Sequence, residues 1–417
     1  AARNGVEVEL RGDELKDSPI NREGVLKGEK VYVDINRALA NADAGKPTLI
    51  ARDSLESYQA KLERTVAERS TAGGTVNLLS EGETLLESGV VFDLSGGSVK
   101  YTAANVKTTL LSSGGQSVDI ADASAETRYD GIATRYVKDF GRWNVKKVFD
   151  LGQSYRFDPG YVEGKDAGTL NVVGMKAVVM QADIQGRTTT GELQREAGVS
   201  PEGARFKLGS DAVVLNGIHD YKLNQRVEVS SNGTTLPAGF AFGDVLSQAM
   251  KDTLVLNPAL MGKDKVAHLQ VLSNQAAEVR EALRMPMGGS VAITAAGVAV
   301  KADIQAASGD ISLAAVTNTL NSTSSPLDVT VADGVSLSAR GGWINDLPAA
   351  TGKSADAVKV DGGSVTLTAT GGDVALGENT LIDVSGGARV KPDGKLKNGN
   401  GGNVKLETDR GLRLGGE

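Results

Sequence analysis

The segment from residue 129 to residue 161 holds the side chains best suited to binding chemistry. Eight of the chain's seventeen aromatic residues fall within these 33 positions. Arginines and lysines lie between them, so rings that stack on sugars or apolar groups alternate with cations that could hold an acidic glycan. The same rings could instead form the small core that an insertion needs. The candidate ligand contacts are Tyr129, Tyr136, Arg142, Trp143 and Tyr155.

A second candidate is the tripeptide Arg11-Gly12-Asp13, which follows the alternating sequence of residues 6–10. This tripeptide is recognised by integrins when an exposed loop presents it. A match of three residues arises often by chance, and the same residues suit an ordinary turn after a strand. The tripeptide is therefore a candidate adhesion motif with a competing structural explanation.

Few residues have the types and spacing that catalysis or metal binding requires. The two histidines, His219 and His268, do not lie in a zinc-binding spacing, and the chain has neither cysteine nor a Gly-x-Ser-x-Gly sequence. Paired carboxylates would suit a glycan-cleaving enzyme. The aspartates that we considered stand singly, where the solvent face of a strand would place them: Asp93, Asp119, Asp310 and Asp383. We therefore predict no enzymatic activity, no cofactor and no metal.

A repeated phrase predicts the elements that position these side chains. Two glycines are followed by alternating polar and apolar residues at 73–78, 96–101, 288–293, 362–367 and 401–406. Glycine permits tight corners, and the alternation predicts half-buried strands. Corners and strands that recur every 20 to 30 residues are typical of a solenoid. We predict an all-β parallel β-helix with non-repetitive insertions and a few short helices.

The repeat divides the chain into five predicted segments. Residues 1–70 form a charged entry segment with one amphipathic helix over 53–70. Residues 168–285 form an irregular β-helix with loops and short helices over 244–253 and 275–284. The remaining segments are β-helix coils over 71–121, the aromatic and basic insertion over 122–167, and regular coils over 286–417.

Composition limits the classes of function. The formal net charge of −7 argues against binding nucleic acid through bulk electrostatics. The absence of cysteine fits a chain that crosses an oxidising compartment. Because no apolar run reaches 18 residues, we predict no membrane-spanning helix. Both ends stop in mid-pattern, as expected of a piece of a longer polypeptide.

Several longer phrases, at residues 8–15, 65–76, 92–97 and 129–132, resemble proteins of the filamentous haemagglutinin family. The resemblance covers most of the chain and is to an internal region of unassigned function. It implies a very large Gram-negative exoprotein that an outer-membrane transporter exports by two-partner secretion and that folds into a right-handed parallel β-helix. The family's amino-terminal secretion domain is not recognisable, so we assign no transporter recognition to this segment.

The resemblance implies a secreted protein of the bacterial surface. We expect a structural and adhesive segment, a stiff rod for adhesion or biofilm formation whose partner is a receptor or glycan on a host or neighbouring cell. Two alternatives stay open. The segment could be a scaffold that carries a contact-dependent growth inhibition toxin, which a toxic domain in the parent protein would reveal. It could also be a carbohydrate-active β-helix enzyme, which glycan turnover would reveal.

Overall fold

The computed structural model describes residues 6–9, 13–15, 24–62, 64–214, 218–241, 243–316, 327–347 and 358–415. Strands make up 42% and helices 12%, and several sheets are parallel, which confirms a mainly β fold. The chain forms two compact units. Unit 1 contains residues 70–99 and 162–417, and unit 2 contains residues 6–69 and 100–161. Strands β7 (Ser98–Thr102) and β15 (Tyr161–Gly164) carry the chain from one unit to the other.

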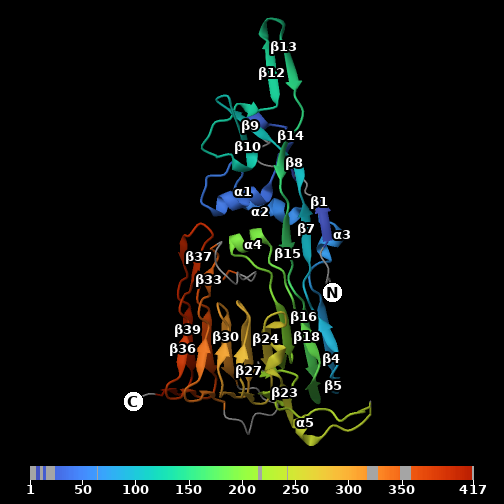
Figure 1. The fold of residues 1–417 in the computed structure, drawn as a ribbon, viewed down its shortest axis with the longest axis vertical. Coiled ribbons are helices and arrows are strands. Elements are labelled where there is room, and N and C mark those ends of the chain that lie inside the picture. Colours follow the sequence, from blue (N-terminus) through green and yellow to red (C-terminus); the bar gives the residue numbers. More distant parts are fainter. Residues whose placement is uncertain are drawn as a thin grey trace. The chain divides into compact units, whose positions relative to one another are not determined.

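Unit 1 is built on parallel sheets whose strands lie side by side in Figure 1. The largest sheet has eight strands: β4 (Thr75–Ser80), β16 (Thr169–Gly174), β19 (Ala204–Leu208), β24 (Val266–Leu272), β27 (Ser290–Ala295), β30 (Asp310–Ala315), β34 (Ser364–Ala369) and β39 (Asn403–Thr408). The second has seven: β23 (Thr253–Leu256), β22 (Arg226–Val229), β25 (Ala277–Val279), β28 (Val298–Val300), β31 (Val329–Val331), β35 (Val374–Leu376) and β40 (Leu412–Leu414). The third has four: β26 (Leu283–Arg284), β29 (Ile304–Gln305), β32 (Ser336–Ser338) and β36 (Leu381–Asp383).

The chain visits these three sheets in turn. Strands β27, β28 and β29 enter the eight-, seven- and four-stranded sheets in that order, and β30, β31 and β32 repeat the sequence. The first two rounds also place β5 (Glu83–Leu86) beside β17 (Ala177–Met180) and β6 (Val91–Asp93) beside β18 (Asp183–Gln185) in parallel pairs. Strands after Gly-Gly were predicted from the repeat, and β4, β27, β34 and β39 confirm them.

The core of unit 1 is made of columns of like residues. In-register pairing places Val291 beside Ile311 and Ile311 beside Val365, all of them buried. A parallel neighbour lies about 4.8 Å away, so each apolar side chain contacts the equivalent one in the next strand. No round of three strands could bury these side chains alone. The stability of the unit therefore comes from contacts between successive rounds.

The repeated glycines sit in a column of close backbone contacts. A Cβ built on Gly363 would lie 1.7 Å from the carbonyl oxygen of Gly309, and one built on Gly402 would lie 1.7 Å from that of Gly363. The same oxygens accept hydrogen bonds from Ser364 N and Asn403 N. A glycine is required at these corners because a side chain would occupy the space of the neighbouring peptide group.

Unit 1 also contains elements outside the three large sheets. Two short helices, α4 (Glu192–Ala197) and α5 (Gln248–Asp252), and the 3₁₀ turn Pro258–Leu260 interrupt the strands. Strand β33 (Trp343–Asn345) pairs with β37 (Ala388–Val390), which pairs with β38 (Leu396–Asn398), and β20 (Ala212–Val214) pairs with β21 (Ile218–Asp220). The helix predicted over 275–284 is wrong, because these residues form β25, whose three side chains are all buried, and β26, in which Leu283 is buried.

A buried ion cluster joins α4 to the strands. Arg195 donates two hydrogen bonds to the Asp346 carboxylate at 2.7 and 2.8 Å, and Arg389 Nε donates a third at 2.8 Å. Asp346 and Arg389 are only 6% and 5% exposed. The hydrogen bonds from Arg195, together with its charge and that of Arg389, hold the pKa of the Asp346 carboxyl below its usual range.

Unit 2 has a separate core to which α1 (Ile35–Asp43) and α2 (Arg52–Lys61) contribute side chains. A third helix, α3 (Val66–Arg69), follows α2 in the chain. The sequence predicted one helix over 53–70, but the chain breaks it into α2 and α3. Thr65 and Glu68 form a reciprocal capping box, in which Thr65 Oγ1 accepts from Glu68 N and Glu68 Oε2 accepts from Thr65 N. This box starts a new helix and explains the break.

The strands of unit 2 are short and mostly antiparallel. Its 3₁₀ turns are Gly24–Leu26, Ile120–Asp122 and Gly141–Trp143. Its strands are β1 (Val6–Glu9), β2 (Asp13–Leu15), β3 (Val31–Val33), β8 (Ala104–Thr108), β9 (Leu110–Ser113), β10 (Gln116–Asp119), β11 (Gly131–Ile132), β12 (Arg135–Phe140), β13 (Val145–Asp150) and β14 (Ser154–Asp158). Within the described ranges, no helix has the length and apolarity needed to cross a membrane.

Candidate functional site

The aromatic and basic segment folds mainly as a β-hairpin in unit 2. Strands β12 and β13 pair from Arg135 opposite Asp150 to Phe140 opposite Val145 (Figure 1). The turn between them ends at Asn144, whose φ of 52° is left-handed, a conformation that asparagine tolerates better than most residues. Nearly every residue of both strands is exposed. The hairpin therefore presents two faces to solvent.

The two faces differ in charge. Directly opposed residues in an antiparallel pair share a face. The ion-paired face carries Arg135 with Asp150 and Asp139 with Lys146, whose charged groups lie 3.9 and 3.5 Å apart. The other face, which we call the aromatic face, carries the side chains of Tyr136, Lys138, Phe140, Val145, Lys147 and Phe149.

Two lysines on the aromatic face have no acidic partner. Lys138 lies directly opposite Lys147, and like charges in this arrangement destabilise a strand pair. No ion pair joins either ammonium group to a carboxylate in the described part of the chain. Each one instead lies over a ring, Lys138 Nζ at 5.1 Å from the Phe140 centroid and Lys147 Nζ at 5.1 Å from that of Phe149. Both ammonium groups therefore keep a positive charge that an anionic ligand could neutralise.

The rings of the hairpin are accessible. Tyr136 is 59% and Trp143 68% exposed, and Arg142 lies 5.9 Å from the Trp143 ring centroid at the turn. Tyr136 packs beside Phe149 with centroids 6.2 Å apart. A two-stranded hairpin is marginally stable by itself, and these ring and cation contacts add to its backbone pairing and to the ion pairs on its other face. A contiguous exposed aromatic surface is typical of an interaction site.

The five candidate ligand contacts fall in three places. Tyr136, Arg142 and Trp143 lie on the hairpin, and Tyr155 lies on β14 with 57% of its surface exposed. Tyr129 is only 9% exposed, and its hydroxyl accepts a hydrogen bond from Ser124 N and donates one to Ser124 O. Tyr129 thus closes its own loop within the core of unit 2. Of the tripeptide 11–13, Arg11 and Gly12 lie outside the described residues.

The aspartates considered for glycan cleavage hold local structure. Asp93 Oδ1 accepts a hydrogen bond from Ser95 N, and Asp383 Oδ1 accepts one from Ser385 N in the same way. Hydrogen bonds from Ser385 lower the pKa of the Asp383 carboxyl. Asp310 accepts from Ser364 Oγ, and Asp119 accepts from Thr108 Oγ1. Among the described residues, no three histidine or acidic side chains form a cluster that could hold a metal ion.

The histidines also lie within structural contacts. His268 Nε2 lies 2.9 Å from a Glu202 carboxylate oxygen, and its Nδ1 lies 2.9 Å from Ser290 Oγ on the neighbouring strand. The hydrogen bond from His268 lowers the pKa of the Glu202 carboxyl. His219 Nδ1 contacts the Asp211 carboxylate. The two histidines lie in different parts of unit 1.

Sequence reasoning did not single out Lys138, Lys147 and Phe149 as contacts. The signal was present in the alternation of residues 135–140 and 145–150 about a four-residue turn, which fixes the faces once pairing is assumed. Comparison with protein-family models, with curated proteins and with solved structures finds no match to this chain.

Proposed function

We propose that this chain is a structural and adhesive segment of a secreted bacterial surface protein and that it binds anionic glycans through the aromatic face of the hairpin. The observation that carries the binding proposal is the unpartnered, ring-backed lysine pair, Lys138 and Lys147. A sulfated or uronate sugar matches it, because the anion fits between the ammonium groups and the apolar face of the sugar ring stacks on Tyr136 or Phe149.

The structural part of the proposal rests on the order of strands in unit 1. Successive rounds through three parallel sheets are what the coils of a right-handed parallel β-helix would produce. Such a stack would serve as a stiff support for contact surfaces on its excursions. The proposed setting is the bacterial surface, following the resemblance to filamentous haemagglutinin proteins, and the proposed role of the segment is not catalytic.

Binding of dextran sulfate tests the adhesive proposal. We expect the purified chain to bind dextran sulfate but not uncharged dextran, with an affinity that falls as NaCl is raised, since salt screens exposed charges. The double variant Lys138→Gln/Lys147→Gln should bind about tenfold more weakly, the effect of two exposed ion pairs. Polygalacturonate, measured alongside, separates carboxylate from sulfate recognition.

Neighbouring residues of β13 provide the matched control. Lys146 lies next to Lys147 but on the ion-paired face, beside Asp139. We expect Lys147→Gln to weaken binding severalfold and Lys146→Gln to leave it within about twofold. Equal losses in the two variants would show that general positive charge, and not the aromatic face, is responsible. Equal binding of dextran would overturn the anion proposal.

Removal of the exposed rings tests the stacking contribution. Trp143→Ala and Tyr136→Ala should each weaken dextran sulfate binding by about fivefold or more while leaving the melting temperature of the chain unchanged, because both rings lie outside the buried cores. The same assay on Tyr155→Ala shows whether β14 takes part. Unchanged binding in both ring variants would show that the lysine charges, and not ring stacking, account for dextran sulfate binding.

A further inference from the structure

The parallel ladder of unit 1 is interrupted between β17 and β23. Strand β17 pairs with β5 on one edge, and β23 is the end strand of the seven-stranded sheet. In the described chain no strand pairs with the second edge of either one. The two strands lie near each other without backbone hydrogen bonds between them. We call this unpaired boundary between β17 and β23 the seam.

A glutamine side chain closes one end of this seam. Gln225 is fully buried, and its amide oxygen accepts a hydrogen bond from Val178 N at 2.6 Å. Its amide nitrogen donates to Val178 O at 3.1 Å and to Met250 O at 2.6 Å. A side-chain amide therefore makes the bonds that a peptide group of a neighbouring strand would make. The free edge of β17 can therefore form a pair of hydrogen bonds with an amide group that is not part of a strand.

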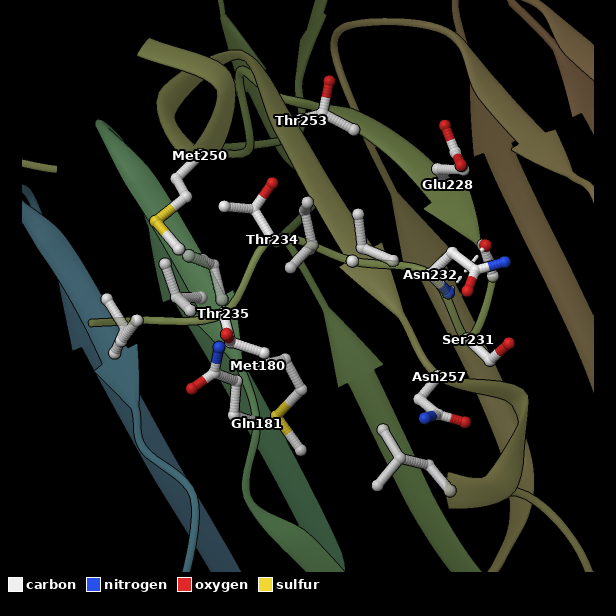
Figure 2. A pocket seen from close by; sticks show the side chains of 18 of the residues that line it. Met180, Gln181, Glu228, Ser231, Asn232, Thr234, Thr235, Met250, Thr253 and Asn257 are labelled. Atoms are coloured by element: carbon white, nitrogen blue, oxygen red, sulfur yellow. Dashed lines mark hydrogen bonds between the residues drawn. The ribbon is translucent and has the colours of Figure 1, made fainter. Parts of the chain in front are cut away.

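The next equivalent position on β17 opens into a cavity. Backbone groups alternate along a strand, so the N–H and C=O of Met180 point to the same side as those of Val178, about 7 Å farther on. A cavity of about 1100 Å³ lies here, lined by both Met180 and Val255 of β23. Figure 2 shows Met180 and Gln181 on one wall and Asn232, Ser231 and Asn257 on the other.

The lining is rich in neutral hydrogen-bonding groups. Gln181 Nε2 is buried and makes no hydrogen bond in the described chain, a state that costs roughly 1–3 kcal/mol. Hydroxyl and amide side chains of the loop after β22 border the same space: Ser231, Asn232, Thr234 and Thr235. Three of the five charged lining residues are ion-paired, Asp183 with Lys265 and Glu228 with Arg280. The other two are Arg226 and Asp252. Apolar surface comes from Val255, Leu236 and Met250.

We infer that this cavity binds a sugar that carries an acetamido group. The acetamido N–H and C=O would bond the β17 edge at Met180, as the Gln225 amide does at Val178. Rotation of Gln181, whose Nε2 gives up no hydrogen bond by turning, would supply a further donor to the acetamido oxygen. The threonine, serine and asparagine side chains would bond the sugar hydroxyls, and the methyl group would contact Val255 or Leu236.

The lining favours a sugar over a peptide. An extended peptide would use backbone bonds and place alternate side chains in pockets, and it would leave the hydroxyl groups of Thr234 and Thr235 without a role. A polyhydroxylated ring uses them. The site is independent of the hairpin, because its lining residues all belong to unit 1 whereas the hairpin belongs to unit 2.

Titration of the whole chain with small ligands, followed by protein-observed NMR or calorimetry, tests the inference. We expect N,N′-diacetylchitobiose to bind, and cellobiose, which has hydroxyl groups in place of the acetamido groups, to bind at least tenfold more weakly. Gln181→Leu and, separately, Thr235→Val should each weaken diacetylchitobiose binding by about fivefold or more. Gln270→Leu, which removes a glutamine amide from the outer face of β24 away from the cavity, should leave it unchanged.

Each other outcome overturns the inference. Equal binding of cellobiose would make the acetamido group irrelevant, and tighter binding of N-acetylalanine methylamide would identify a peptide site. Absence of binding by a folded chain would reject a sugar site. Thr235 is exposed, so Thr235→Val keeps the test valid even where Gln181→Leu lowers the melting temperature. The variant Lys138→Gln/Lys147→Gln should retain diacetylchitobiose binding, which separates a failure here from a failure of the hairpin proposal.

Discussion

Gly363→Ala is expected to destabilise unit 1 by at least about 3 kcal/mol, enough to abolish cooperative folding in a marginally stable protein. The new Cβ would lie 1.7 Å from Gly309 O, the oxygen that accepts the hydrogen bond from Ser364 N. This clash can be removed only if the backbone at Gly363 moves away from the backbone at Gly309. That movement breaks the first hydrogen bond between β30 and β34 and shifts the buried Ile311 and Val365 out of contact.

Gly401→Ala is the matched control for this substitution. Gly401 belongs to the same kind of glycine pair, but its added Cβ would have no heavy atom closer than 3.9 Å. Alanine should leave the thermal unfolding midpoint within about one degree of the parent, whereas Gly363→Ala should lower it by about 5 °C or more or prevent folding. Circular dichroism melts of the two variants decide the matter. Similar midpoints would show that the glycine column tolerates a side chain and that close packing at the corners is not essential.

Asp346→Ala is expected to cost about 3–5 kcal/mol, because it leaves the buried Arg389 and the half-buried Arg195 without their counter-ion. Arg195 and Arg389 both bond the Asp346 carboxylate, and Arg389 has almost no access to solvent. The loss should detach α4 before the sheets unfold, since Arg195 joins that helix to the end of β33. Hydrogen exchange should therefore speed up first in residues 192–197.

The cost of Asp346→Ala should depend on pH. Hydrogen bonds from Arg195 lower the pKa of the folded carboxyl below the ordinary value of about 3.9. A depressed pKa contributes stability that is fully present above the unfolded value and is lost as pH falls through the folded one. The difference in unfolding free energy between parent and variant should thus be largest near neutral pH and shrink below about pH 4.

Asp393→Ala controls for the loss of a surface aspartate. Asp393 pairs with Lys395, and both side chains are largely exposed. Its replacement should change the urea midpoint far less than Asp346→Ala does at pH 7. A comparable change in both variants, or a penalty at Asp346 that grows toward acid pH, would contradict the buried ion cluster as a determinant of stability.

Many strands of unit 1 could be predicted because the signal for each one lies within a few consecutive residues. Glycine pairs followed by alternating residues mark β4, β27, β34 and β39, and the same Asp-to-Ser turn precedes a glycine pair at residues 93–95 and at residues 383–385. Short apolar runs without such glycine corners fit the spacing of a helix and that of a strand equally well. Residues 275–284 were assigned to a helix for this reason, although Ala277 and Val279 point into the core of a sheet.

The candidate sites were less predictable because they depend on pairing between distant segments. The aromatic composition marked the hairpin, but only the register of β12 and β13 separates the aromatic face from the ion-paired face. Tyr129 belongs by composition to the same segment, yet the chain buries it. The cavity combines β17, β22, β23 and the loop after β22, and no single stretch of sequence carries its signature. The cavity exists because β17 and β23 do not pair with each other, and the sequence of neither strand indicates which strands it pairs with.

In-register pairing in unit 1 does not depend on how much chain separates the partners. The side chains of Asn77 and Asn171 form a hydrogen bond although their positions are 94 residues apart, whereas Ser290 pairs with Asp310 only 20 residues later. Pairing thus constrains which residues each strand contains, but it does not constrain the length of the excursions, the segments of chain that connect one paired strand to the next. We therefore expect insertions and deletions within an excursion to leave the paired strands in place. The proposed contact surface on the hairpin belongs to such an excursion, so we expect its sequence to be less constrained than that of the supporting strands.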